Sequence, residues 1–248
     1  MSSCRWLTIA CGAVLLTGAT ALANAQARSG DVSTDREGLV QVESTRFDAI
    51  YLLPGADFRG YTKIMLDPAR VAFAESWMRD VNQGRDLSRR TTREDAEQIA
   101  DEARTGIGGI FTDALKKMGY EVVAAPGADV LWLSPQVLDL YITAPAKLTR
   151  SPDARVYTTD AGKATLVLQI RDSSTGALLG RTVDHRTAGD RANFQDPRSF
   201  RLRSPTSTVS NRGDFEALFV TWARSSTEGL AELKAQSPAP RVATAPKP

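Results

Sequence analysis

The stretch RDSSTGALLGRTVDHR, residues 171–186, contains two serines, two aspartates and the only histidine of the chain. These are the residue types of a hydrolase triad, in which the histidine takes the proton of the serine and the carboxylate orients the histidine. The same residues also fit a β-hairpin, because the turn sequence SSTG ends in Gly176. The spacing of the polar residues decides between the two interpretations.

The spacing favours the hairpin. Adjacent residues of a strand point to opposite faces, so Asp184 and His185 cannot form a dyad. Ser173 and Ser174 belong to the turn, and at about 3.3 Å per residue an extended strand places them roughly 30 Å from His185. No G-x-S-x-G elbow occurs in the sequence. We therefore assign no catalytic residue, although a site that combines His185 with distant segments stays open.

Metal and cofactor sites have no support in the sequence either. Both cysteines, Cys4 and Cys11, lie within residues 1–25, which are expected to be removed as an export signal. One histidine then remains, which is too few for the usual ligand set of zinc. No EF-hand spacing is present. The glycines at 106, 108 and 109 lie inside a helical pattern, whereas a phosphate-binding loop precedes its helix. We expect no metal and no cofactor.

Residues 1–25 have the features of an export signal. Arg5 precedes an uncharged apolar run, and Ala23-Asn24-Ala25 fits the small-x-small cleavage rule. Glycine and threonine interrupt the run, which argues against a membrane anchor. We expect a periplasmic or secreted protein that is cleaved near Ala25. A lipoprotein anchored through Cys11 is the less favoured alternative, because LTIA is a poor lipobox.

The charge balance argues against nucleic-acid binding. The chain has 31 Lys+Arg and 29 Asp+Glu, and cleavage of the signal would remove only Arg5 from this set. A nucleic-acid-binding domain usually has a strong basic excess. Between residues 79 and 93 the arginines are interleaved with acids, which is typical of a solvated mixed-charge surface. No segment after the signal is long and apolar enough to span a bilayer.

The rest of the chain predicts one domain. We expect a flexible leader at 26–45, the domain at 46–234 and a disordered tail rich in proline and alanine at 235–248. Strands are expected at 61–68, 120–123, 129–144, 163–172 and 177–187, and Pro135 is expected to interrupt the third of them.

Two helices complete the predicted domain. Thr91 and Glu94 form a capping box for a helix that Gly119 ends, and its three internal glycines are expected to permit close approach to a sheet. Apolar spacing predicts a second helix from about Asn211 or Asp214 to Lys234. The order of elements predicts an α+β fold: a mainly antiparallel sheet with two long helices packed on one face.

Three stretches carry a family resemblance: FDAIYLLPGADFRGYTKIMLDPARVAF, the helix REDAEQIADEARTGIGGIFTDALKKMGYEVV, and LQIRDSSTGALLGRTVDHR. The sequence resembles the bacterial envelope proteins grouped as domain of unknown function 3313. The resemblance implies an envelope domain, with peripheral association with the outer membrane among the options, and it implies no activity. Members of the family are often lipoproteins, whereas this sequence has no convincing lipobox.

We expect an exported, non-enzymatic protein that binds an unidentified partner in the cell envelope. The long segment at 189–213 offers aromatic and arginine contacts of the kind found at interfaces. The candidate contact residues are Phe194, Phe200, Arg201 and Arg203. Two alternatives stay open: a hydrolase-type enzyme whose site is assembled from distant segments, and a domain that binds a small ligand between the first helix and the sheet.

Overall fold

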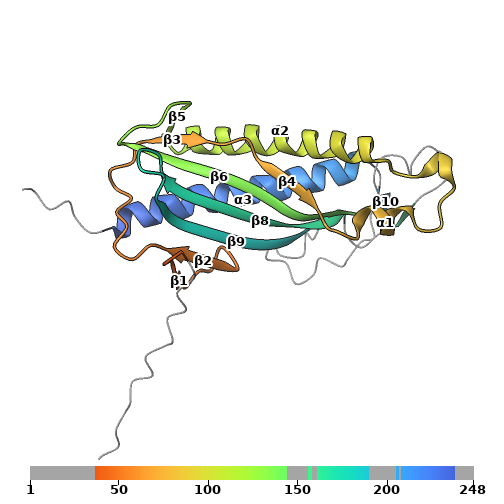
Figure 1. Cartoon of the computed structure of the whole chain (residues 1–248), viewed down its shortest axis with the longest axis horizontal. Helices are drawn as coiled ribbons and strands as arrows, with labels where there is room; N and C mark the ends of the chain where they lie inside the picture. Colours follow the sequence, from red (N-terminus) through yellow and green to blue (C-terminus); the bar gives the residue numbers. More distant parts are fainter. Residues whose placement is uncertain (1–36, 144–155, 158–160, 190–204, 207, 238–248) are drawn as a thin grey trace, which may run out of the picture. The chain divides into compact units, whose positions relative to one another are not determined.

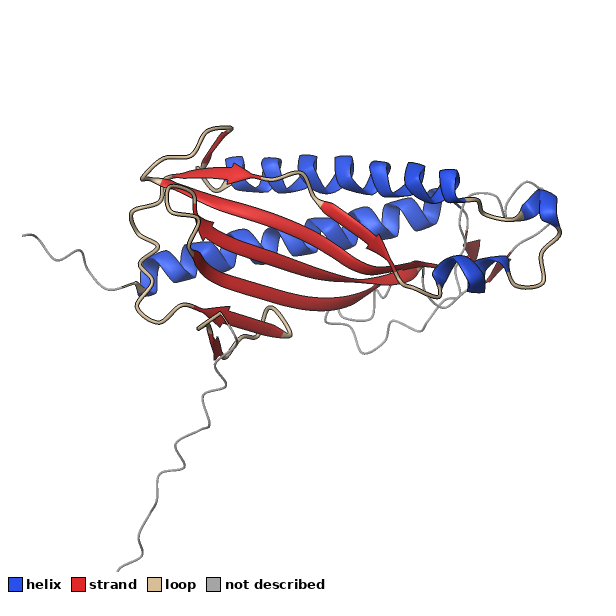
Figure 2. Ribbon diagram, viewed as in Figure 1, coloured by secondary structure: helices blue, strands red, loops and turns tan. Residues whose placement is uncertain are grey.

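The computed structural model describes residues 37–143, 156–157, 161–189, 205–206 and 208–237. The predicted signal at 1–25 and nearly all of the predicted tail lie outside these residues. Two long helices cover one face of an eight-stranded sheet (Figures 1 and 2). The predicted α+β fold class is confirmed. No helix among the described residues has the length and apolar character needed to cross a membrane.

The main sheet has the order β1-β2-β9-β8-β6-β3-β5, and β4 also pairs with β6. The strands are β1 (Val40–Val42), β2 (Ala49–Leu52), β3 (Lys63–Leu66), β4 (Arg70–Phe73), β5 (Glu121–Val123), β6 (Val130–Ile142), β8 (Gly162–Asp172) and β9 (Leu178–Ala188). A separate two-stranded sheet joins β7 (Val156–Tyr157) and β10 (Pro205–Thr206). The main sheet is mixed, because β6 runs antiparallel to β8 and parallel to β3 and β4.

The helices are α1 (Trp77–Asn82), the short 3₁₀ helix η1 (Leu87–Arg89), α2 (Arg93–Lys117) and α3 (Thr208–Gln236). Both α2 and α3 lie behind the sheet in Figure 1, on the same face. One apolar core joins the sheet to α2 and α3. Its fully buried members include Phe111 of α2, Trp222 of α3, and Leu133 and Leu166 of the sheet. Side chains therefore fill the space between α2 and the sheet, where the small-ligand alternative required a cavity.

Helix α2 begins one residue later than the sequence predicts. Thr92, rather than Thr91, is the N-cap: its hydroxyl accepts from the backbone N–H of Asp95 at 3.2 Å, and the Asp95 carboxylate accepts from the N–H of Thr92 at 2.7 Å. Thr91 is unavailable because the side-chain amide of Asn82 bonds both its N–H and its C=O. Gly119 follows the last turn with a φ of +86°, as predicted.

The prediction that the glycines of α2 allow close approach to the sheet is wrong. A Cβ built at Gly106, Gly108 or Gly109 would meet no atom within 4 Å. The apolar stripe of α2, with Ile107 and Phe111, faces the sheet instead, so these glycines lie beside the contact and not in it.

Strand β6 continues through Pro135, contrary to the predicted interruption. Pro135 lies where the neighbouring strand changes, since β3 pairs up to Leu133 and β4 pairs from Gln136. A missing backbone donor therefore costs little there. A bulge follows, with Asp139 at a φ of 51°, and it shifts the alternation of faces. Val137 and Leu140 consequently share the core, although strict alternation along a strand would place them on opposite faces.

The ordered domain starts before residue 46. Strand β1 lies within the predicted leader and pairs antiparallel with β2, and Leu39 is fully buried. Neither strand was predicted from the sequence. Helix α3 likewise begins at Thr208, inside the segment that was predicted to be irregular.

Candidate functional site

The hairpin interpretation of residues 171–186 is confirmed, because β8 and β9 pair antiparallel through this turn. The Asp172 carboxylate accepts from the N–H and hydroxyl of Ser174 and Thr175, and from the Tyr61 hydroxyl at 2.7 Å. The Ser173 hydroxyl donates to the carbonyl of Gly127 at 3.0 Å. Both serines and the aspartate thus hold the turn and the neighbouring loop, and neither serine contacts His185.

We expect Asp172 to make folding sensitive to acid. The hydrogen bond from Ser174, followed by that from Tyr61, lowers the pKa of Asp172 well below its usual range. A depressed carboxylate pKa contributes stability that is present above the unfolded-state pKa of about 3.9 and is lost as the pH falls below it. Asp172→Asn should lower the free energy of unfolding by about 2 kcal/mol at pH 7. In urea titrations from pH 7 to pH 2, the difference between the two proteins should shrink below pH 4; a constant difference would contradict this assignment.

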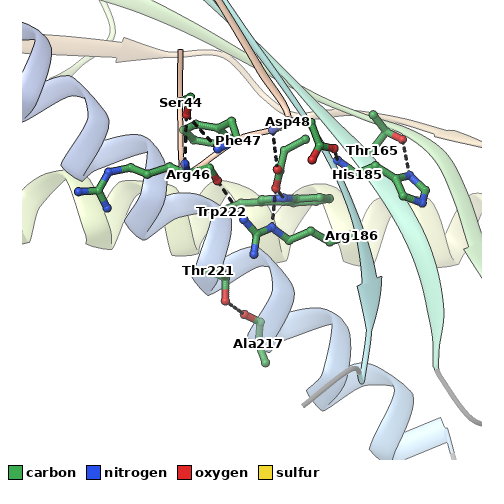
Figure 3. A network of polar contacts seen from close by, with 11 residues as sticks. Ser44, Arg46, Phe47, Asp48, Thr165, His185, Arg186, Ala217, Thr221 and Trp222 are labelled. Atoms are coloured by element: carbon green, nitrogen blue, oxygen red, sulfur yellow. Dashed lines mark hydrogen bonds and ion pairs between the residues drawn. The ribbon is translucent and has the colours of Figure 1, made fainter. Parts of the chain in front are cut away.

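His185 is exposed, and its ring contacts no carboxylate among the described residues. The ring Nδ1 lies 3.1 Å from the Thr165 hydroxyl on the adjacent strand (Figure 3). Its backbone N–H donates to the Asp48 carboxylate at 2.8 Å. The predicted separation of Asp184 and His185 on opposite faces of β9 is confirmed, since Asp184 is 3% exposed and faces α3.

Asp184 anchors a buried polar cluster between β9 and α3. One carboxylate oxygen accepts from the Trp222 indole N–H at 2.8 Å and from Arg186 Nε at 2.5 Å, and the other accepts from the backbone N–H of Asp48 at 3.2 Å (Figure 3). A buried carboxylate is tolerated when such donors replace its lost hydration. These three bonds fix the position of β9 against α3. Because both carboxylate oxygens are engaged by them, Asp184 is not free to act as an acid or a base.

Residues 44–48 are fastened to α3 by a second set of contacts. The Arg46 guanidinium bonds Glu228 and Glu232, each at 2.5 Å, and Phe47 is buried beside α3. The hydrogen bond with Glu232 raises the pKa of Arg46 and lowers that of Glu232. The carbonyl of Arg46 also accepts from Arg186 at 3.1 Å, which connects this segment to β9.

These three elements surround a groove of about 690 Å³. Its walls are residues 45–48, the end of β9 from Asp184 to Gly189, and the face of α3 from Gly213 to Glu228. Two of its cations, Arg46 and Arg186, are engaged by carboxylates. The third, Arg224, is exposed, and no carboxylate of the described chain pairs with it.

The floor of the groove includes an open strand edge. On the side away from β8, strand β2 pairs with β9 only from Gly180 to Val183, and no other described strand continues the ladder. His185 points its N–H to this side, toward Asp48. Because backbone direction alternates along a strand, the N–H of Thr187 faces the same side. Within the described part of the chain, the last residues of β9 therefore present an edge without a partner strand, on which the Asp48 carboxylate bonds the N–H of His185.

The sequence did not reveal this site. The predicted contact residues Phe194, Phe200, Arg201 and Arg203 lie outside the described residues, so the structure does not place them. Sequence reasoning also missed the pair of Asp184 and Trp222. One signal was present, because Asp184 is a charged residue on the same face of β9 as Thr182, and the structure buries both. Among the described residues, no cluster of His, Cys, Asp and Glu is arranged to hold a metal ion.

The fold and the site together define an α+β domain with a helix-walled groove beside an open strand edge. The chain belongs to the family described as protein of unknown function DUF3313, whose model matches residues 28–226.

Comparisons with other known proteins found distant similarity to solved structures. A search of curated proteins found no match. Two solved structures of PelC from Paraburkholderia phytofirmans, both described as dodecamers and one of them a point variant, are similar at 12% and 11% identity. Each comparison covers 71% of this chain, with 96% and 94% of the PelC chain and TM-scores of 0.31 and 0.33.

Proposed function

We propose that this protein is a non-enzymatic, exported component of the bacterial cell envelope that binds a partner protein in the groove between β9 and α3. In this proposal an extended segment of the partner adds to the open edge of β9. The observation that carries it is the edge of β9 beyond Val183, which has no partner strand among the described residues and lines the groove.

The chemistry of the groove supports a peptide as its occupant. An unpaired strand edge binds another chain through regular main-chain hydrogen bonds, and side-chain pockets then select the sequence. Here α3 supplies such a wall, and Arg224 offers a charge that an acidic side chain of the partner would neutralise. The polar groups around Asp184 are already satisfied, which supports binding rather than acid–base chemistry.

The assignment to the envelope depends on the sequence of residues 1–25, which has the features of a cleaved export signal. It predicts that the mature protein begins at Gln26 and is found in the periplasm or outside the cell. N-terminal sequencing of the protein recovered from cells tests this prediction. An intact Met1 in cytosolic material would overturn the assignment to the envelope but not the groove.

A proline at Thr187 tests the proposed binding mode. Thr187→Pro removes the N–H that faces the open edge, while its C=O and the pairing of β9 with β8 are kept. We expect partner recovery after in-cell cross-linking to fall at least tenfold, with an unfolding free energy within about 1 kcal/mol of wild type. Thr187→Ala is the matched control, because it deletes the side chain but keeps the N–H. Equal recovery with both variants would exclude binding through the strand edge.

One observation favours a second function, that of a hydrolase. The groove includes His185 and Asp48, and the Thr165 hydroxyl lies 3.1 Å from the His185 ring. A nucleophile also needs a base held in place by a third group, and no described carboxylate contacts this ring. His185→Gln tests the hydrolase directly, because it removes the imidazole but keeps the backbone N–H at this position; the unfolding free energy should stay within about 0.5 kcal/mol of wild type. Loss of an esterase or peptidase activity in this variant would favour the hydrolase.

A further inference from the structure

A short segment at 83–93, from the end of α1 to the first residue of α2, combines features that the groove does not explain. Leu87 at its tip is 81% exposed, the most exposed large hydrophobic side chain among the described residues. Four arginines surround it in the sequence: Arg85, Arg89, Arg90 and Arg93. We call residues 83–93 the arginine loop. In Figure 1 the loop, with its helix η1, lies beyond the ends of β6, β8 and β9.

The exposure of Leu87 is built into the fold. The Asn82 side chain bonds both backbone groups of Thr91, at 2.7 Å and 2.8 Å, and so closes the base of the loop. Within the loop, the N–H of Arg89 donates to the carbonyl of Asp86 at 2.9 Å, which sets the 3₁₀ turn. Because these hydrogen bonds hold Leu87 in an exposed position, its side chain can contact an apolar surface without a change in the loop conformation.

The charge of the arginine loop selects the kind of surface. Among the described contacts, none of its four arginines forms an ion pair; Arg90 donates only to the backbone carbonyl of Arg85. The nearby carboxylates are fewer: Asp86 within the loop, and Glu94 and Asp95 in the first turn of α2, where Asp95 is engaged in the capping box. Arg85 is only partly exposed, with its Nη1 buried, whereas Arg89, Arg90 and Arg93 are exposed. The loop therefore carries three exposed cations and an exposed apolar side chain.

We infer that the arginine loop binds an anionic phospholipid surface, with Leu87 inserted among the headgroups and its exposed arginines, Arg89, Arg90 and Arg93, against the phosphates. Arginine beside a lipid phosphate and an apolar residue at the interface are the two recognised contributions to peripheral membrane binding. This surface is separate from the β9 groove, so the inference does not depend on the proposed function. It gives the domain an orientation on a membrane without requiring an anchor.

Vesicle sedimentation tests the inference. The full-length gene is expressed, and the protein is purified in the form that the cells accumulate. It is then mixed with vesicles of phosphatidylcholine alone or with 30% phosphatidylglycerol. We expect binding at least tenfold stronger to the anionic vesicles in 0.1 M salt, and a loss of most of this preference in 0.5 M salt. Equal binding to both vesicle types would overturn the inference.

Paired variants assign the binding to the loop. Leu87→Ser should weaken binding to anionic vesicles about tenfold, and Arg89→Gln with Arg90→Gln about thirtyfold. Val220→Ser changes another exposed hydrophobic residue, on α3, and Lys116→Gln with Lys117→Gln removes the same charge at the far end of α2; both should bind within twofold of wild type. If the arginine pair matters but Leu87→Ser has no effect, insertion is excluded. If the control pairs weaken binding equally, the loop is not the site.

Discussion

Asp184→Ala is expected to lower the free energy of unfolding by about 3–5 kcal/mol, because removing one partner of a buried charge cluster leaves the others uncompensated. The Trp222 indole N–H would be buried without an acceptor, and Arg186 would lose the carboxylate that holds its guanidinium. The backbone N–H of Asp48 would lose its acceptor as well, which removes one of the bonds that hold residues 44–48 to β9. Urea unfolding followed by tryptophan fluorescence measures this loss.

Two variants make the Asp184 experiment specific. Asp57 pairs with Arg59 at the surface, and an exposed pair contributes little, so Asp57→Ala should leave the urea midpoint close to that of wild type. Asp184→Asn keeps one oxygen acceptor and should recover part of the loss. A loss below about 1 kcal/mol for Asp184→Ala would show that the cluster does not fix β9 against α3.

Gly162→Ala is expected to have a similarly large effect, for a steric reason. Gly162 has a φ of +144°, and a Cβ built there would lie 2.0 Å from the carbonyl oxygen of Tyr141 and 3.0 Å from Phe215. We expect a loss of about 4 kcal/mol, to which overpacking contributes roughly 1–3 and the strained backbone about as much. Gly162 pairs with Ala188, so the same change should also disturb the end of β9 beside the groove.

The control for Gly162 is a glycine in open space. Gly109 lies within α2, and a Cβ there would meet no atom within 4 Å, so Gly109→Ala should stabilise the protein by about 1 kcal/mol. Thermal unfolding of the two variants should therefore shift in opposite directions. A destabilising Gly109→Ala would indicate that a partner or a second copy approaches this face of α2.

The sequence predicted the elements whose signals are local and repeated. The stripe of α2 and the alternation of Leu166, Leu168 and Ile170 in β8 each extend over many residues, and the structure buries the predicted faces. The turn at Asp172 was also predictable, since a hairpin of this kind is set by the residues of the turn itself. The short strands β1 and β2 were missed, whereas β3 and β5, which are equally short, were predicted.

The candidate site could not be predicted for a different reason. Its parts come from residues 45–48, β9 and α3, and only tertiary packing brings Asp48, Asp184 and Trp222 together. The open edge of β9 also depends on strand pairing, because β2 begins only at Ala49, which lies opposite Val183. The bulge at Asp139 was not predictable from the sequence pattern either. It shifts the alternation of β6, so that residues after the bulge lie on the opposite face from the one that strict alternation predicts.

The most direct measurement of the central claim is photo-cross-linking in living cells from single positions. A photoreactive amino acid replaces Thr221, which lies in the groove wall on α3, or Lys116, which is exposed at the end of α2. Binding in the groove predicts one adduct of defined mass from position 221, absent when Thr187→Pro is added, and none of that mass from position 116. The same adduct from both positions, or none from position 221, would contradict a partner segment bound between β9 and α3.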